Sequence, residues 1–302
     1  MAYIDKILSG KKTFYYLGKT IRTGEHTWKK IRIKLGVKEP TREEIGRKLK
    51  ELRLEEYKVY NKDYLDADKL EIIDDFKEVY AVHLKKIPKT VVEKEEEDFI
   101  IRFTYNSNAI EGNRLTLRDT YFIIKEKQIP SGAPPKDYNE AINGRSAFDF
   151  IKTYEGKLDM DFLERLNFIL TQNTGVVYSG RMRFFPVKIE GADFKPPEPE
   201  KVKPLILQMI NFYYKNKRKI HPFVMACLIH AQFVEVHPFE DGNGRTGRAL
   251  MNWVLMRAGY PKVFVPVKLR PKYYEAIDCH NEKKIKEYCE KMFEVVMEQF
   301  HI

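Results

Sequence analysis

The sequence contains little cysteine and no long hydrophobic run. Its 302 residues include three cysteines, Cys227, Cys279 and Cys289, which lack the spacing of a zinc site or a disulfide framework. No segment approaches the length of apolar chain that crosses a bilayer, and the first residues lack the apolar core of a signal peptide. These absences predict a cytoplasmic protein with reduced thiols and no membrane partner.

Cofactor fingerprints are also absent. The chain has neither a Gly-rich phosphate loop ending in Lys and Ser or Thr nor the G-x-G-x-x-G pattern of dinucleotide-binding domains. Hydrophobic residues make up 43% and charged residues 32% of the chain, which is ordinary for a globular protein. The length suffices for one large domain with one or two small ones. Any chemistry must therefore come from side chains that act on a substrate.

The basic residues are unevenly distributed. The chain has a net charge of +10, and residues 1–40 hold ten Lys or Arg against three Asp or Glu. Alternating patterns at 13–17 and 31–36 predict two or three short strands. A basic, aromatic β-segment could contact nucleic acid, but we favour a solvated meander packed on the main domain or a homodimer contact. Residues 41–95 are highly charged, have helical spacing and open on a capping-box pattern.

The most informative segment runs from residue 237 to residue 248 and reads HPFEDGNGRTGR. Before it, residues 221–236 are largely apolar, with proline only in the first turn, which predicts a buried helix. After it begins a second apolar run, 245–257, which predicts another helix. The break between them contains Gly242, Asn243 and Gly244. N–H groups in such a break, at a helix N-terminus, form a concave anion site for phosphate oxygens.

The polar residues of this segment each have a chemical use. His237 titrates near neutrality and can accept a proton from an attacking hydroxyl. Asp241 supplies a hard oxygen suited to Mg²⁺ shared with phosphates. Arg245 and Arg248 are three apart, so they share a helix face and can hold a phosphate tail. The set predicts transfer of a phosphate-containing group, because such transfer depends mainly on positioning and charge neutralisation.

Two other histidines have a simpler interpretation. His221 and His230 lie on the apolar helix, where a histidine is usually a satisfied core residue. His230 and His237 are seven apart and could share a face, but no third ligand stands at metal-site spacing. We therefore predict core histidines rather than a metal pair.

The 237–248 segment matches every fixed position of HPFx[D/E]GNGRxxR, and the chain resembles the Fic (filamentation induced by cAMP) family over residues 96 to 295. The resemblance implies a mainly α fold: a Fic-type helical core at 96–302 with a β-hairpin flap. A basic β-rich segment at 1–40 and a charged helical segment at 41–95 would form a small N-terminal extension. The implied activity is transfer of AMP from Mg-ATP to a Ser, Thr or Tyr hydroxyl of a protein, which could be the chain itself.

The segment SNAIEG, from Ser107 to Gly112, resembles the family's inhibitory motif [S/T]xxxE[G/N]. Its position before the core motif resembles the subclass with the inhibitory helix on the N-terminal side. The resemblance implies that Glu111 pairs with Arg248, which could not then hold the terminal phosphate of the nucleotide. The alternative is an ordinary helix end capped by Gly112. We favour the regulatory interpretation.

A short alternating segment resembles the family's flap, which holds the target chain by strand addition over the nucleotide site. It consists of Val187, Lys188, Ile189 and Glu190. Flanking glycines and a Pro-rich stretch predict a hairpin in an otherwise helical chain. A hairpin with a purely structural role is the alternative.

Three further residues carry the resemblance. Tyr273 and Asn281 are eight apart, on one face of a predicted helix, and resemble the aromatic and amide residues that contact the nucleotide's base and sugar. An aromatic residue there could also be core. Gly244 stands where the related Doc branch, which transfers phosphate, carries Lys. The chain therefore resembles the nucleotidyl-transferring members.

Three alternatives stay open. Glu111 could orient a water against AMP on a target, which would make the chain a de-AMPylating hydrolase. The donor could be UTP or a phosphocholine carrier, since no residue visibly reads the base. The chain could instead be a nucleic-acid-binding regulator that uses its basic first forty residues, in which case its DNA affinity would depend steeply on salt.

Overall fold

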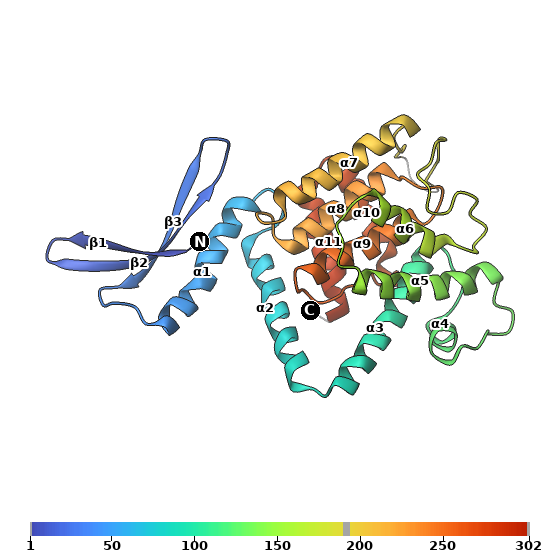
Figure 1. Cartoon of the computed structure of the whole chain (residues 1–302), viewed down its shortest axis with the longest axis horizontal. Coiled ribbons are helices and arrows are strands. Elements are labelled where there is room, and N and C mark those ends of the chain that lie inside the picture. Colours follow the sequence, from blue (N-terminus) through green and yellow to red (C-terminus); the bar gives the residue numbers. More distant parts are fainter. Residues whose placement is uncertain (1, 190–193, 301–302) are drawn as a thin grey trace.

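The computed structural model describes residues 2–189 and 194–300 and is mainly helical, as predicted (Figure 1). The strands are β1 (Tyr3–Ser9), β2 (Lys12–Arg22) and β3 (Trp28–Gly36). The helices are α1 (Arg42–Tyr60), α2 (Ala67–Lys86), α3 (Lys89–Ile110), α4 (Leu117–Tyr121), α5 (Pro135–Thr153), α6 (Met160–Thr171), α7 (Pro199–Asn216), α8 (Pro222–Val236), α9 (Asn243–Arg257), α10 (Arg270–Asn281) and α11 (Ile285–Met297). Short turns complete the set: η1 (Phe122–Glu126), η2 (Val267–Leu269) and η3 (Glu298–Phe300).

The N-terminal sheet confirms the predicted strands. Its order is β1-β2-β3, both pairs are antiparallel, and a register shift falls between Tyr15 and Tyr16. Leu17, Ile21 and Ile31 form a small core with Leu52 of α1. Figure 1 shows the sheet at one end of the molecule, joined to the helical body through α1. The sheet therefore has its own small core.

The charged segment at 41–95 is shared between two cores. The predicted capping box is present, because Thr41 Oγ1 accepts from the Glu44 N–H at 3.2 Å and Glu44 accepts from the Thr41 N–H at 2.8 Å. It starts α1, which packs on the sheet. Leu70 and Ile73 of α2 instead join the main hydrophobic core. The boundary between the two cores thus lies between α1 and α2.

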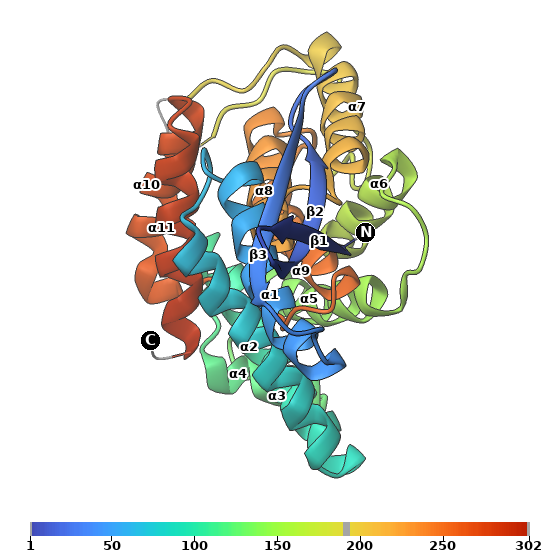
Figure 2. The ribbon, with the colours of Figure 1, turned by 90° about the vertical axis from the view of Figure 1, so that its left-hand side faces the viewer.

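The main core surrounds α8. This helix contacts α7, α9, α10 and α11, and twelve of its fifteen residues are buried. It matches the helix predicted at 221–236, with His221 as its N-cap. The second predicted helix, α9, begins two residues earlier than expected, at Asn243. Viewed from the end that carries the sheet, the strands lie in front of α8 and α9 (Figure 2). Among the described residues, no helix is both long and apolar enough to cross a membrane.

The predicted hairpin is wrong for the part of the flap that the structure describes. Residues 187–189 have no regular structure, and Glu190 lies outside the described residues. Proline at 186, 196 and 197 removes backbone donors from the segment. A two-stranded hairpin is marginal without a third strand. The described flap residues, 187–189, therefore form no strand despite their alternating pattern.

Candidate active site

The turn after α8 places His237 at the end of a buried helix. Its backbone is left-handed, with φ 50° and ψ 60°, and its N–H donates to Phe233 O at 3.0 Å. The side chain of Asn243 then closes the loop: Nδ2 donates to Phe239 O and Oδ1 accepts from the Phe239 N–H, both at 2.9 Å. We expected Asn243 to hold phosphate, but both polar atoms of its side chain bond to Phe239 inside the loop. Only its backbone N–H can face an anion.

The start of α9 has the predicted character of an anion site. Gly242 is its N-cap and has φ 77°, a left-handed conformation that favours glycine. The first N–H groups of a helix have no partner within it, so those that follow Gly242 can face an anion. Asn167 of α6 supports the loop from below: its Nδ2 donates to Asp241 O at 2.9 Å, and its Oδ1 accepts from the Gly180 N–H at 3.1 Å. The loop is thus held rigidly before any ligand binds.

His237 is in the state that a general base requires. Burial lowers its pKa to about 4, although the contact between Nδ1 and Val234 O at 3.3 Å opposes the shift. A carbonyl can only accept, so Nδ1 carries the hydrogen and Nε2 keeps its lone pair. The imidazole is therefore neutral at pH 7, with Nε2 as the proton acceptor.

Asp241 is ionised beside this base. Burial alone would raise the pKa of Asp241, but Arg245 and the Gly242 N–H outweigh it and lower that pKa. The Asp241 side chain is 42% exposed, so it can still reach a ligand. Within the described residues, no cluster of three or more metal-ligating side chains occurs. One hard, ionised carboxylate fits Mg²⁺, which usually takes one or two carboxylates plus phosphates and water.

Arg245 is buried between two carboxylates. Its Nη1 lies 2.9 Å from Glu140 of α5, and its Nη2 lies 3.3 Å from Asp241. Glu140 also accepts from Asn113 Nδ2 at 2.7 Å. The Nε of Arg245 has no hydrogen-bond partner among the described residues. The guanidinium thus fixes Asp241 and keeps a donor available for a ligand.

The guanidinium of Arg248 donates hydrogen bonds from all three of its nitrogen atoms, most of them to the segment that ends α3. Its Nε donates to Ser107 Oγ at 3.0 Å, and its Nη2 donates to Ser107 O and to Glu111 Oε1, both at 2.7 Å. Its Nη1 donates to Tyr273 Oη at 3.3 Å. The expected pair between Glu111 and Arg248 is therefore formed. Glu111 is also the C-cap of α3, and Gly112 has φ 91°. The alternative interpretation, a helix end capped by Gly112, therefore holds together with the ion pair.

Gly244 leaves room for that ion pair. A Cβ at this position would overlap Glu111 Oε1 and would lie 3.0 Å from Arg248 Nη1. The family resemblance associated Gly244 with transfer of a nucleotide rather than of a phosphate. The geometry adds a local reason, because a side chain here would displace Glu111 from Arg248.

Tyr273 and Asn281 both lie on α10, but they differ in availability. Tyr273 is 1% exposed and its hydroxyl contacts His230 Nε2 at 2.8 Å as well as Arg248. Its ring is therefore core, which corrects the expected contact with the base. Asn281 Oδ1 is buried and has no hydrogen-bond partner among the described residues, so it can still bind a ligand donor.

The two histidines earlier in this segment, His221 and His230, are core residues, as predicted. Burial lowers the pKa of His230 to about 3, and its Nδ1 contacts Tyr288 Oη at 3.1 Å. His221 caps α8 through Nδ1, which accepts from the Phe223 N–H, and its Nε2 lies 3.2 Å from Asp74. Neither is part of the candidate site.

Sequence reasoning missed Arg183. This residue is 3% exposed and precedes the flap. Its Nε donates to His237 O at 2.7 Å, its Nη2 donates to Pro197 O at 2.6 Å, and its N–H donates to Pro238 O at 2.8 Å. It therefore ties the flap to the backbone of the base. A lone Arg in an irregular segment carries no sequence signal for this role.

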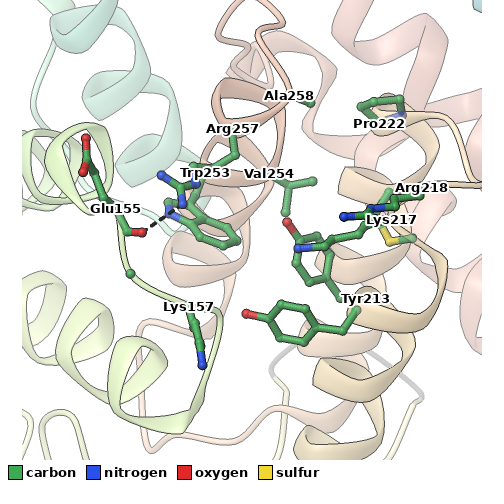
Figure 3. A pocket seen from close by; sticks show the side chains of 13 residues that line it. Glu155, Lys157, Tyr213, Lys217, Arg218, Pro222, Trp253, Val254, Arg257 and Ala258 are labelled. Carbon is green, nitrogen blue, oxygen red and sulfur yellow. Dashed lines mark hydrogen bonds between the residues drawn. The ribbon is translucent and has the colours of Figure 1, made fainter.

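A separate cavity lies at the other end of α8 and α9. Its volume is about 600 Å³, and Figure 3 shows Lys157, Lys217, Arg218 and Arg257 around Tyr213 and Trp253. Lys217 is the C-cap of α7 and Arg257 is the last residue of α9, and cations at these C-terminal ends offset the helix dipole. Their charges and rings also form cation–π contacts, with Arg257 5.7 Å from the Trp253 centroid. These roles account for the basic rim without a ligand.

Comparisons with known proteins identify the family of this chain. The Fic/DOC family model matches residues 157–255. "Protein adenylyltransferase Fic" of Nematostella vectensis is 30% identical over 74% of this chain and 53% of its own length. The Drosophila melanogaster protein of the same name is 31% identical over 74% of this chain and 46% of its own length.

Solved structures show the same fold. Fic-1 of C. elegans superposes with a TM-score of 0.66 and 26% identity, over 76% of this chain and 68% of that one. A Fic domain containing signaling protein of Bacteroides thetaiotaomicron gives 0.67 and 25%, over 75% and 92%. This chain belongs to the Fic/DOC family. It spans about half the length of the curated relatives that it matches.

Proposed function

We propose that this chain is a protein adenylyltransferase that Glu111 holds in a restrained state. The observation that carries the proposal is the engagement of Arg248 Nε and Nη2 by Ser107 and Glu111, next to a neutral His237. Arg248 would bind phosphate during transfer, but here Glu111 of the same chain is bound to it. The transferase site is therefore restrained. The names of the similar proteins support the class of reaction.

The transfer uses residues of the α8–α9 turn. His237 Nε2 takes the proton of a Ser, Thr or Tyr hydroxyl on a target protein or on the chain itself. The hydroxyl oxygen then forms a bond to the α-phosphorus of ATP, and the bond from that phosphorus to the bridging oxygen breaks. Pyrophosphate leaves with the electron pair. The N–H groups of Asn243 and Gly244, at the start of α9, stabilise the charge that develops on the α-phosphate, whereas the N–H of Gly242 donates to Asp241 Oδ1.

Asp241 would hold Mg²⁺ in this proposal. When bound, the ion would neutralise charge on the nucleotide phosphates. Arg245 keeps Asp241 ionised and in place through the 3.3 Å contact. Its free Nε and the released Arg248 would bind the outer phosphates, because guanidinium groups hold phosphate oxygens in fixed geometry.

The flap and α10 would complete the site. Arg183 bonds to Phe185 O, two residues before 187–189, and to His237 O, so an extended target segment that paired with the backbone of 187–189 would lie near the base. Asn281, with its unpaired Oδ1, would accept from the ribose or base of the nucleotide. All three cysteines are buried free thiols, which fits a reducing compartment such as the cytoplasm.

Glu111→Gly tests the restraint. The change frees Arg248 and removes negative charge from the phosphate site. Loss of one charge-assisted pair is worth about 1.5–3 kcal/mol, so transfer should rise roughly ten- to a hundredfold. The assay measures label from α-labelled ATP on the chain and on lysate proteins, with the other three nucleotides in parallel.

Glu111→Gly combined with Arg248→Ala is the matched control and should be inactive, because the arginine is needed once it is released. Equal or lower transfer by Glu111→Gly would refute the restraint. Stronger transfer from labelled UTP than from ATP would refute AMP as the transferred group.

Removal of AMP is the second candidate. Glu111 is 33% exposed and influences the pKa of His237, so it lies where it could orient a water against a modified target. In that case Glu111→Gly would abolish the release of AMP from a pre-labelled protein instead of increasing labelling. The same pair of variants therefore distinguishes the two directions.

A further inference from the structure

The outer face of the N-terminal sheet has no part in the proposed transfer. Leu17, Ile21 and Ile31 are buried against α1, so the residues that alternate with them lie on the opposite face. On β3 these residues are Trp28, Lys30, Arg32 and Lys34, and all four are exposed. β3 thus presents a line of three cations that begins at a tryptophan.

The neighbouring strands add aromatic rings to this line. The register pairs Lys34 with Tyr16 and Trp28 with Arg22, and cross-strand partners share a face. Lys34 Nζ lies 4.9 Å from the Phe14 ring centroid, Lys30 Nζ lies 5.2 Å from that of Tyr3, and the Arg22 guanidinium lies 5.8 Å from that of Trp28. The face therefore alternates cations with rings.

The charge of this face is almost uncompensated. The three strands carry one acidic residue, Asp5, which pairs with both Lys30 at 2.7 Å and Arg32 at 2.9 Å. Within the described chain, Lys34 forms no ion pair. One carboxylate shared by two cations leaves a net positive surface.

The position of the sheet leaves this face open. α1 packs on the inner side, through Leu52. Figure 1 shows the strands at one end of the molecule, away from α5 and α9, which carry Glu140, Arg245 and Arg248 of the candidate site. Trp28 is 63% exposed, which is unusual for so large an apolar side chain.

We propose that this outer face binds double-stranded DNA through its phosphate backbone. Alternate residues of a strand are roughly 6.6 Å apart, so Lys30, Arg32 and Lys34 form a row whose spacing resembles that of successive phosphates. The major groove, about 12 Å wide, admits β-structure, and the rings can contact sugars and base edges. Three aligned cations fit a regular polyanion better than they fit the scattered carboxylates of an acidic protein. The inference does not depend on the transfer reaction.

Binding of a fluorescent 24-base-pair duplex of random sequence to the full chain tests this proposal. Anisotropy titrations at several salt concentrations give the slope of log K against log salt, which is about −0.9 for each phosphate contact. The test variant is Lys30→Ala, Arg32→Ala, Lys34→Ala. The matched control, Lys201→Ala, Lys203→Ala, Lys215→Ala, removes the same charge from α7.

The sheet variant should lose tenfold or more in affinity at 100 mM salt, and its slope should become shallower by about two to three contacts. The control should keep a slope close to that of the parent. Thermal melts check that the sheet variant remains folded. If it does not, Lys34→Glu alone, at an exposed residue without an ion pair, should still weaken binding several-fold.

Four results would overturn the proposal. Absence of salt-dependent binding below 50 mM salt is the first, and an equal loss in the α7 control is the second, since it would indicate only the net charge of the chain. The third is equal competition by polyglutamate of matched charge, which would indicate an acidic protein partner. The fourth is tenfold tighter binding of single-stranded DNA, which would indicate base stacking on the rings.

Discussion

Two buried arginines on one face of α9 pair with glutamates in different settings. Arg245 and Arg248 are both 2% exposed. Glu140, the partner of Arg245, is 5% exposed on α5, whereas Glu111, the partner of Arg248, is 33% exposed at the end of α3. Glu140 cannot leave without opening the core, but Glu111 can move into solvent. A permanent ion pair and a releasable one therefore lie three residues apart.

The difference follows from how each carboxylate is held. Glu140 lies within α5 and accepts from Asn113 as well as from Arg245. Glu111 is the C-cap of α3, just after the last helical residue, and Gly112 follows it in a left-handed conformation. The ends of helices fray and move more easily than helix interiors. The restraint is thus placed where the local cost of release is smallest.

The largest effect is expected at the base, and it tests whether release acts through the active site. His237→Ala in the Glu111→Gly background should lower transfer by about 100- to 10,000-fold, because no group remains to accept the hydroxyl proton. ATP affinity should stay near that of the parent, since binding rests on the loop and the arginines. Label transfer and equilibrium nucleotide binding are measured separately. Transfer that persists in a folded protein would remove His237 from the mechanism.

Breaking the permanent pair, Arg245 with Glu140, should lower the stability of the protein without raising its transfer activity. Glu140→Gln removes the buried carboxylate and leaves Arg245 only the more exposed Asp241. The cost should therefore be up to the about 3–5 kcal/mol that is lost when a buried pair is broken. Urea unfolding of this variant and of Glu111→Gln compares the two pairs, and the Glu111 variant should lose clearly less. A Glu140→Gln protein with raised transfer and unchanged stability would show that the two pairs are equivalent.

Removal of the proposed Mg²⁺ ligand, Asp241, affects Arg245, which contacts it, but not the pair between Arg248 and Glu111. Asp241→Ala should remove the Mg²⁺ dependence of ATP binding and lower turnover roughly ten- to a hundredfold, because an ion stabilises phosphate charge by several kcal/mol. Arg245 would lose one carboxylate and keep Glu140, so the fold should survive. ATP affinity is measured with and without Mg²⁺. An unchanged response to the ion would exclude Asp241 as its ligand.

The smallest effect is expected at Gly244. Alanine there would overlap Glu111 Oε1, so it should weaken the Glu111–Arg248 pair and raise transfer a few-fold, about 1 kcal/mol or less. In the Glu111→Gly background the carboxylate is already absent, so the same change should give no increase. A double-mutant cycle on initial rates measures the coupling. Independent effects of the two changes would show that Gly244 does not accommodate the carboxylate.

Much of the helical site could be predicted because its signals are local. The apolar run before His237 and the Gly-containing break after it define a helix, a turn and a helix from neighbouring residues alone. The pair between Glu111 and Arg248 was predicted from resemblance, since 137 residues separate the two along the chain. No local rule reports a contact of that range, so only a family pattern could suggest it.

The errors have a common physical origin. The alternating flap residues carry a strand pattern, but a strand needs a neighbour, and prolines remove its donors. Tyr273 was expected at the nucleotide, yet its hydroxyl is bound by Arg248 and His230 inside the core. In both cases a residue's surroundings, and not its type, decided its role.

The sequence by itself determined which groups are present and how they are spaced along the chain: a base, a carboxylate, two arginines at a helix start, and a basic alternating segment at the N-terminus. Those properties depend on covalent order and on helix or strand period. Tertiary structure decided which charges meet. Packing gave Arg245 a buried partner, Glu140, and gave Arg248 a partner, Glu111, that is 33% exposed. It also lowered the pKa of His237 by burial and left one face of the sheet uncovered. Burial and proximity arise only when distant segments pack, so no property of a single segment contains them.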